Sequence, residues 1–253
     1  MTNKAKIHYL YHDGFAVETE NYFLIFDYYV DTPKGDERNI ENGVISKEDL
    51  EGRKKVLVFS SHSHHDHFNP LILEWEKYNK NIKYILSSDI FLENYNKNHL
   101  IAYENRKLNV DGANIKVFGS TDIGVSYYVE VDGIAIFHAG DLNWWHWEND
   151  PMEEQADMEL NFKSIINKLH NSVDNVDISF FPVDYRLDKF FYLGGNYFIN
   201  KIKPNLFVPM HYWENTYIVK DFIEKMEEIN EVVPCEIALV EERGQVIKFS
   251  KSV

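Results

Sequence analysis

Histidine and aspartate residues that could bind a metal ion are concentrated in segment 61–67, Ser-His-Ser-His-His-Asp-His. Four of the eleven histidines of the chain lie within six positions there. Neutral imidazole is the commonest ligand for zinc-like ions, and a carboxylate completes a mixed coordination shell. His62 and His64 are two residues apart in an extended segment, so both side chains point the same way and can hold one ion. Asp66 and His67 come at the following turn and can face a neighbouring position.

The elements that must position these side chains are short apolar strands. Residues 56–59, directly before the histidines, form an apolar run typical of a strand buried on both faces. Asp141 follows the apolar run 134–137, and His211 follows the run 206–208. Ligand sites in layered α/β folds gather at strand ends, so we expect these groups to converge on one edge. Taken alone, Asp141 can also be read as a turn residue and His211 as a structural one.

The string His-x-His-x-Asp-His resembles the signature motif of the metallo-β-lactamase superfamily, and further pieces follow in the same order. Residues 11–15 and 23–27 resemble the opening hairpin of that superfamily, which ends in an aspartate. His-Ala-Gly-Asp at 138–141 resembles the segment whose aspartate bridges two metals, and Pro-Met-His at 209–211 resembles the last metal-binding histidine. Within the superfamily, the chain is most similar to small bacterial hydrolases, the group that includes ascorbate-6-phosphate lactonase-like proteins.

The resemblance implies a set of metal ligands. A first ion would be held by His62, His64 and a shared Asp141, and a second by Asp66, His67, Asp141 and His211. We expect one or two zinc ions, with manganese as the alternative because oxygen-rich sites favour manganese or iron.

One expected ligand is missing from this pattern. The superfamily usually supplies another histidine in a segment shaped like Gly-His-Thr-x-Gly, and Ser120 stands at that place here. Asp122 is a candidate replacement for it, weighed evenly against a turn residue that hydrogen-bonds locally.

Aromatic and basic residues beside these ligands suggest a substrate pocket. Three of the five tryptophans, Trp144, Trp145 and Trp147, come shortly after Asp141. We expect them to form the apolar wall of a pocket, with packing in the core as the alternative. Arg186 is a candidate anchor for a carboxylate or phosphate, with a surface salt bridge as the alternative.

The composition excludes several classes of protein. Acidic residues outnumber basic ones by 41 to 26, and the formal charge of −15 argues against general nucleic-acid binding. No apolar run reaches the roughly 18 residues needed to cross a bilayer, and the first residues lack the apolar core of a signal peptide. The single cysteine, Cys235, excludes an intrachain disulfide and fits a reducing compartment. We expect a cytoplasmic protein with a small-molecule substrate and no membrane partner; a homo-oligomer is left open.

Apolar runs and turn residues predict strands first and then a mixture of strands and helices, twice over. Asp132–Gly133 predicts a type I′ hairpin turn, and residues 32–55 read as loop with at most a short helix. The order, with the resemblance, predicts a single domain, 1–253, of the α/β (α+β) class: a four-layer αββα sandwich of the metallo-β-lactamase type. The expected strands are 7–11, 15–18, 22–26, 56–59, 84–86, 115–118, 125–131, 134–137, 176–181, 206–208, 237–240 and 246–249, and the expected helices 70–78, 90–95, 160–169, 197–202 and 219–229.

The function expected from these features is metal-dependent hydrolysis of a small-molecule ester, lactone or phosphoester by an activated water. Asp66 is the expected catalytic residue, orienting the nucleophile and carrying a proton to the leaving group. The alternative is a catalytically degenerate metal-binding or regulatory scaffold of the same fold, and Ser120 is its best support. Di-iron oxidoreductases of the superfamily resemble His-x-Glu-x-Asp, so His64 at the middle position disfavours them.

Overall fold

The strands of the protein form two sheets of seven strands each, seen in a computed structural model that describes residues 2–53 and 55–252. The first sheet has the order β14-β1-β2-β3-β4-β5-β6 and the second the order β13-β12-β11-β10-β9-β8-β7. The strands of the two sheets are β1 (Thr2–Tyr11), β2 (Gly14–Glu18), β3 (Phe23–Phe26), β4 (Val56–Ser60), β5 (Ile82–Ser87), β6 (His99–Ala102), β7 (Lys107–Val110), β8 (Ala113–Phe118), β9 (Ser126–Val131), β10 (Ile134–His138), β11 (Ile178–Pro182), β12 (Leu206–Met210), β13 (Glu236–Ile237) and β14 (Val246–Ser252).

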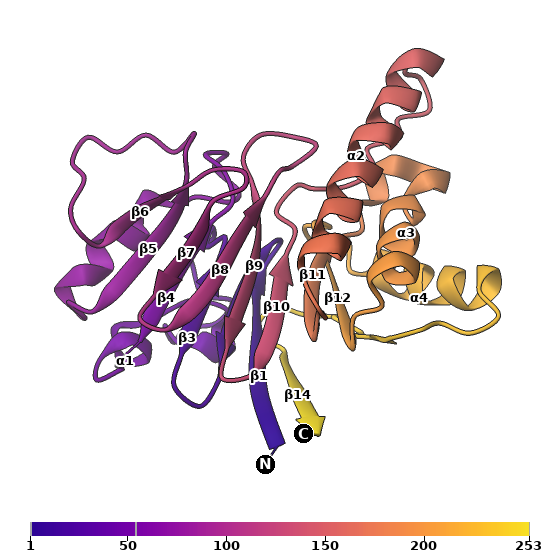
Figure 1. Cartoon of the computed structure of the whole chain (residues 1–253). Helices are drawn as coiled ribbons and strands as arrows, with labels where there is room; N and C mark the ends of the chain where they lie inside the picture. Colours follow the sequence, from indigo (N-terminus) through magenta and orange to yellow (C-terminus); the bar gives the residue numbers. More distant parts are fainter. Residues whose placement is uncertain (1, 54, 253) are drawn as a thin grey trace.

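The two sheets pack face to face, with helices on the outer faces (Figure 1). Helices α2 (Met152–Ser172), α3 (Leu193–Ile202) and α4 (Tyr217–Ile229) lie beside β11 and β12. Helix α1 (Lys47–Leu50) and the 3₁₀ helix η2 (Pro70–Lys77) pack on the first sheet through Leu50 and Trp75. This arrangement confirms the predicted αββα sandwich.

Strand β4 shows how the sequence builds the layers. All five of its residues are buried, and successive side chains of a strand point to opposite faces. Leu57 and Phe59 therefore join the core between the sheets, whereas Val56 and Val58 pack under η2 and α1. Because packing on both faces fixes the position of β4, it also fixes the position at which the following histidine segment begins.

Parallel pairing brings several strand ends to one edge. Strand β3 pairs in parallel with β4, and β10 pairs in parallel with β11, which pairs in parallel with β12. Polar residues follow the carboxyl ends of all five strands: Asp27, Ser61, Asp141, Asp184 and His211.

The secondary structure departs from the prediction at several places. No helix forms at 90–95. Ile90 and Leu92 are buried whereas Phe91 between them is 85 % exposed, and burial of every second residue suits an extended segment rather than a helix. Helix α2 starts at Met152, earlier than predicted, and Leu160, expected on its buried side, is 70 % exposed. Strands β6 and β7 were not predicted, and β13 is only two residues long.

Other predictions agree with the structure. Asp132 and Gly133 both have positive φ, 49° and 74°, as a type I′ turn requires. The segment 32–55 is mainly loop, as predicted, but has two short helices instead of at most one; Lys54 lies outside the described residues. Among the helices in the described part of the chain, none combines the length and the apolar character needed to cross a bilayer.

Candidate metal centre

Two groups of metal-binding side chains lie at the edge where the strands end. The first group, called here the His62 group, contains His62, His64 and Asp141, and one ligand atom from each lies within 4.8 Å of the others. His62 Nε2 lies 3.0 Å from His64 Nδ1 and 3.5 Å from Asp141 Oδ2. His62 is buried and His64 exposed. Two ring nitrogens and a carboxylate oxygen this close can share one cation.

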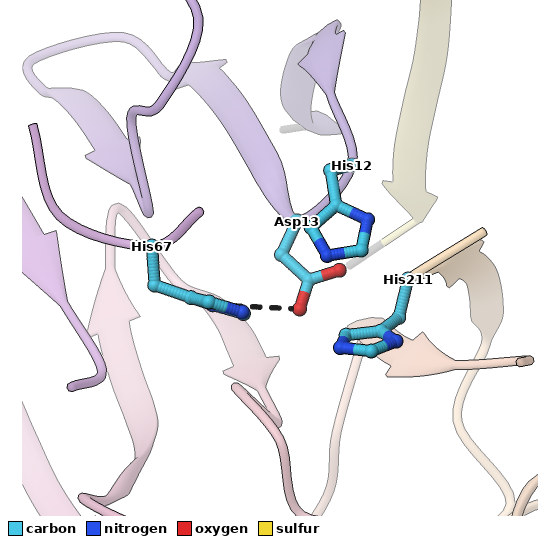
Figure 2. A group of neighbouring side chains, drawn as sticks. All are labelled: His12, Asp13, His67 and His211. Atoms are coloured by element: carbon cyan, nitrogen blue, oxygen red, sulfur yellow. Dashed lines mark ion pairs between the residues drawn. The ribbon is translucent and has the colours of Figure 1, made fainter. Parts of the chain in front are cut away.

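The second group, called here the His67 group, contains His12, Asp13, His67 and His211, again with ligand atoms within 4.8 Å. Figure 2 shows these four side chains pointing toward one another, with Asp13 Oδ2 3.6 Å from His67 Nδ1. All four are buried. Three imidazoles and one carboxylate gather here from the β1–β2 turn, the loop after β4 and the end of β12.

Asp141 lies between the two groups. Its Oδ1 is 3.2 Å from both His67 Nε2 and His211 Nε2, while its Oδ2 faces His62. A single carboxylate therefore faces ligands of both groups, one oxygen to each. Asp66 approaches from the other side, with its Oδ2 3.9 Å from His67 Nε2.

Several buried atoms of this centre make no hydrogen bond within the described chain. They include His67 Nε2, Asp141 Oδ1 and both carboxylate oxygens of Asp13. Buried polar groups are normally paired, because leaving one unpaired costs about 1–3 kcal/mol. Imidazole nitrogens and carboxylate oxygens are ligands of divalent cations, so a group of them that is buried, unpaired and close together fits a bound metal ion.

The buried carboxylate of Asp27 orients ligands of both groups. His67 Nδ1 donates to Asp27 Oδ2 at 2.9 Å, which leaves His67 Nε2 to face the centre. Ser61 Oγ donates to the same oxygen at 2.6 Å and lies 3.0 Å from His62 Nδ1, so it can accept the Nδ1 proton of His62. Nε2 of His62 is then unprotonated and free to coordinate. Carboxylates behind ligating histidines fix the ring tautomer in this way.

A second carboxylate holds His211. His211 Nδ1 donates to Asp184 Oδ2 at 2.9 Å, so its Nε2 also faces Asp141. Arg186 Nε contacts both oxygens of Asp184 at 2.9 Å. Burial would raise the pKa of Asp184, but His211 and Arg186 outweigh it and lower that pKa to about 2. Asp184 is therefore charged at neutral pH and holds His211 in one orientation.

The carboxylates raise the pKa values of the buried imidazoles. Burial lowers the pKa of His67, but Asp141 and Asp27 outweigh it and raise that pKa to about 9. The pKa of His211 is raised well above its ordinary value, against the effect of burial, by Asp141 and Asp13. Burial would raise the pKa of Asp141, but His67 and His211 hold it well below its usual range. Without a metal, His67 and His211 are therefore held as imidazolium groups beside the ionised carboxylate of Asp141.

We expect the affinity for Zn²⁺ to rise with pH. Because the pKa of His67 is raised to about 9, its ring is protonated below that pH in the metal-free protein, and a cation must displace this proton. The apparent affinity should strengthen about tenfold per pH unit for each displaced proton and level off above pH about 9. Chelator competition across pH 6–9.5 measures this slope, and calorimetry in two buffers counts the protons released. Binding without proton release at pH 7 would contradict the assignment.

The backbone is strained at several residues of the centre. His12, Asp27, His211 and Trp213 all have positive φ, between 42° and 69°. Left-handed conformations cost a non-glycine residue about 1–3 kcal/mol and concentrate at functional sites. The packing around these residues therefore holds their side chains in positions that the local chain would not choose.

A cavity of about 300 Å³ opens beside the centre, a size suited to a small ligand. Asp141, His211, Trp145, Trp147 and Arg186 are among the residues that line it. The rings of Trp145 and Trp147 stack at 6.1 Å with an interplanar angle of 6°.

Trp144 does not line this cavity, contrary to the prediction. Its ring stacks on Phe162 of α2 at 6.1 Å, with Lys163 Nζ 4.6 Å from the ring centroid. Trp144 therefore packs against the core, the alternative considered for the tryptophan segment.

The residues around the absent histidine are placed near the centre but in neither ligand group. Ser120 Oγ accepts a hydrogen bond from the Asp122 backbone at 3.2 Å, and Thr121 Oγ1 donates to Asn143 O at 2.6 Å. Asp122 is exposed on the cavity wall. The local hydrogen bond agrees with the alternative that Asp122 is a turn residue. Among the described residues, the His62 group contains no side chain from segment 119–124 in place of the missing histidine.

His12 and Asp13 were not among the predicted ligands. The prediction assigned them only to the opening hairpin. The feature that identified His62 and His211 as candidate ligands is a polar residue that follows an apolar strand. His12 has this feature too, because it directly follows the apolar end of β1.

Comparison of the sequence with protein-family models and with curated proteins finds no match. Solved structures do match over almost the whole chain. Igni18, described as a novel metallo hydrolase from the archaeon Ignicoccus hospitalis, has a TM-score of 0.68 at 19 % identity and covers 98 % of this chain and 100 % of its own. YhfI, a metallo-β-lactamase fold protein from Bacillus subtilis, has a TM-score of 0.63 at 12 % identity over 98 % of this chain and 100 % of its own.

A third similar structure carries different chemistry. CmlA, a diiron β-hydroxylase from Streptomyces venezuelae, has a TM-score of 0.59 at 8 % identity and covers 99 % of this chain but 54 % of its own. Together these similarities show that the chain has the metallo-β-lactamase fold, as the sequence resemblance implied. At these identities they show the fold alone.

Proposed function

We propose that the protein is a metal-dependent hydrolase that cleaves an ester, lactone or phosphoester bond in a small molecule. The observation that carries the proposal is the position of Asp141, which faces ligands of both groups and lines the cavity. The similarity to Igni18, a metallo hydrolase, supports it. The finer resemblance to lactonase-like hydrolases rests on the sequence motifs.

We propose one or two zinc ions, with manganese as the alternative. The His67 group, with Asp66 and Asp141, offers the fuller donor set, whereas the His62 group has three protein donors, of which His64 is exposed. An ion would thus be held more weakly by the His62 group. A divalent cation bound here would supply a Lewis acid that polarises a carbonyl or phosphoryl oxygen and makes water a nucleophile near neutral pH.

Asp66 would orient the attacking water and move its proton. Burial would raise the pKa of Asp66, but the neighbouring His12 and His67 outweigh it and keep that pKa below its ordinary value. The carboxylate is therefore ionised at neutral pH and can accept a hydrogen bond from water. It would then pass the proton to the leaving group.

Arg186 and the two stacked tryptophans would select the substrate. Arg186 uses Nε and Nη2 to hold Asp184, which leaves its Nη1 outside this pair, and the residue lines the cavity. A guanidinium in this position suits a carboxylate or phosphate on the substrate. We therefore expect anionic substrates to be preferred over neutral ones of the same bond type.

Elemental analysis of protein purified without chelator, followed by a panel of chromogenic esters, lactones and phosphodiesters in anionic and neutral forms, tests the proposal. We expect bound metal and turnover of one bond class. His64→Ala should lower that turnover at least about a hundredfold, because it removes one of three donors in the His62 group.

The matched control is His65→Ala. The His65 side chain is 79 % exposed and lies outside both ligand groups, so this variant should retain turnover. Tightly bound metal with no turnover of any bond class would instead favour the scaffold alternative, for which the serine at position 120 is the supporting feature.

A further inference from the structure

His12 is a buried imidazole beside Asp66, the proposed catalytic residue. It lies in the turn between β1 and β2 with no exposed surface. Its Nε2 is 3.6 Å from Asp66 Oδ2 and makes no hydrogen bond within the described residues. A buried ring nitrogen directed at a carboxylate can either coordinate a cation or donate a proton to that carboxylate.

The opposite side of the ring distinguishes these two roles. The backbone N–H of Trp213 donates to His12 Nδ1 at 3.4 Å. A ring nitrogen that accepts a hydrogen bond is unprotonated, so the neutral ring must carry its proton on Nε2. A protonated Nε2 has no lone pair for a metal, and its N–H is directed at Asp66. The geometry therefore favours donation over coordination, although His12 lies within the His67 group.

Several contacts fix the position of the ring. Trp213 stacks on it at 4.0 Å with an interplanar angle of 29°, and the His211 ring lies 4.4 Å away on another side. The His12 backbone N–H donates to Tyr9 Oη at 3.0 Å. The residue has a φ of 55°, a conformation that β-hairpin turns normally reserve for glycine, asparagine or aspartate. A side chain held this firmly can determine the orientation of its neighbour.

We propose that His12 is a positioning residue whose Nε2–H, 3.6 Å from Asp66 Oδ2, orients that carboxylate toward the metal centre by electrostatic attraction. This inference rests on the proposed function, because it assigns Asp66 its orientation for the attacking water. Through His12, the segment 211–213 after β12 is linked to Asp66 in the loop after β4. Residues that orient metal-binding carboxylates typically change metal affinity or activity by 10–100-fold when removed.

Two substitutions of His12 test this role. His12→Leu removes the donor, and His12→Gln keeps an N–H donor at a similar reach. We expect His12→Leu to bind as many metal ions as the wild type at saturation but with about 10–100-fold weaker affinity for Zn²⁺ in chelator competition. It should also lower kcat with little change in KM. His12→Gln should recover a substantial part of both losses.

His8→Leu is the matched control. His8, in β1, is another fully buried histidine, but its Nε2 contacts Glu18 at 2.9 Å, away from the centre. This variant should keep the Zn²⁺ affinity of the wild type even if its melting temperature falls. It therefore separates loss of a buried imidazole in general from loss of the contact to Asp66.

Each result supports or overturns the assignment. If His12→Leu binds fewer ions at saturation, and Co²⁺-loaded protein shows a changed intensity of visible absorption, His12 is a direct ligand and the proposal is wrong. If His12→Gln fails as completely as His12→Leu, or His12→Leu keeps full affinity, the contact to Asp66 does not matter and the proposal is also wrong. A wild type without turnover would contradict the proposed hydrolase, while the affinity and absorption measurements would still decide the role of His12.

Discussion

Substitution of Asp141 by alanine should remove most of the bound metal and reduce turnover at least about a thousandfold. Asp141 is the one carboxylate among the described residues that faces both ligand groups, with Oδ1 3.2 Å from His67 Nε2 and His211 Nε2 and Oδ2 3.5 Å from His62 Nε2. Without it, the His62 group has no carboxylate, and the His67 group keeps Asp13 but loses the carboxylate that links it to His62. Elemental analysis of the purified variant and chelator competition measure the loss of metal.

The stability of the metal-free protein should fall as well. The pKa of Asp141 is held well below its usual range by His67 and His211, so the folded state depends on this charge. Removing one partner of a buried ionic network costs about 3–5 kcal/mol, because the remaining charges are left without compensation. Thermal unfolding in the presence of chelator measures this loss separately from metal binding.

Asp122→Ala is the matched control for Asp141→Ala. Asp122 is a carboxylate of the same cavity, but it is exposed and lies outside both ligand groups. We expect it to keep the metal content and stability of the wild type. If Asp141→Ala retained its full metal content, Asp141 could not be the bridging residue. If Asp122→Ala lost metal, Asp122 would take the place of the missing histidine after all.

Several ligands of the centre could be predicted from the sequence because their positions depend on the strands that directly precede them. A short apolar strand buried on both faces has little freedom, so the polar residues that follow it are fixed in space. His62, Asp141 and His211 each follow such a strand, and the structure brings all three to one edge. The family resemblance added the ligand pairing, which the positions of the strands alone leave open.

What could not be predicted depends on contacts between distant parts of the chain. The position of His12 depends on Trp213, which lies 201 residues away, and nothing in the local sequence encodes that stacking. The three tryptophans are neighbours in sequence, but only Trp145 and Trp147 face the cavity, because Phe162 of α2 offers Trp144 an apolar surface. The helix expected at 90–95 is absent for a related reason, since the apolar cluster under η2 and α1 buries Ile90 and Leu92 and leaves Phe91 between them exposed.

Gly124→Ala should disrupt the centre from outside it. Gly124 has a φ of +84°, and an added Cβ would lie 2.1 Å from Ser61 O and 2.5 Å from His62 Cβ. The Ser61 carbonyl is held by the Val125 N–H at 2.9 Å, so the two segments cannot separate without breaking this bond. We expect a loss of about 3 kcal/mol or more in stability, a fall of roughly 6–12 °C in the melting temperature, and weaker metal binding by the His62 group.

Gly52→Ala separates the clash from the cost of the backbone conformation. Gly52 has nearly the same φ, +76°, but no atom lies within 4 Å of an added Cβ. This variant should lose only about 1 kcal/mol, the cost of a left-handed alanine, and should keep its metal. Equal effects of the two substitutions would mean that backbone strain explains the loss at position 124. A larger loss at Gly124, together with weakened metal binding, would show that the close approach of the 124–125 segment to Ser61 and His62 holds the first ligands of the centre in place.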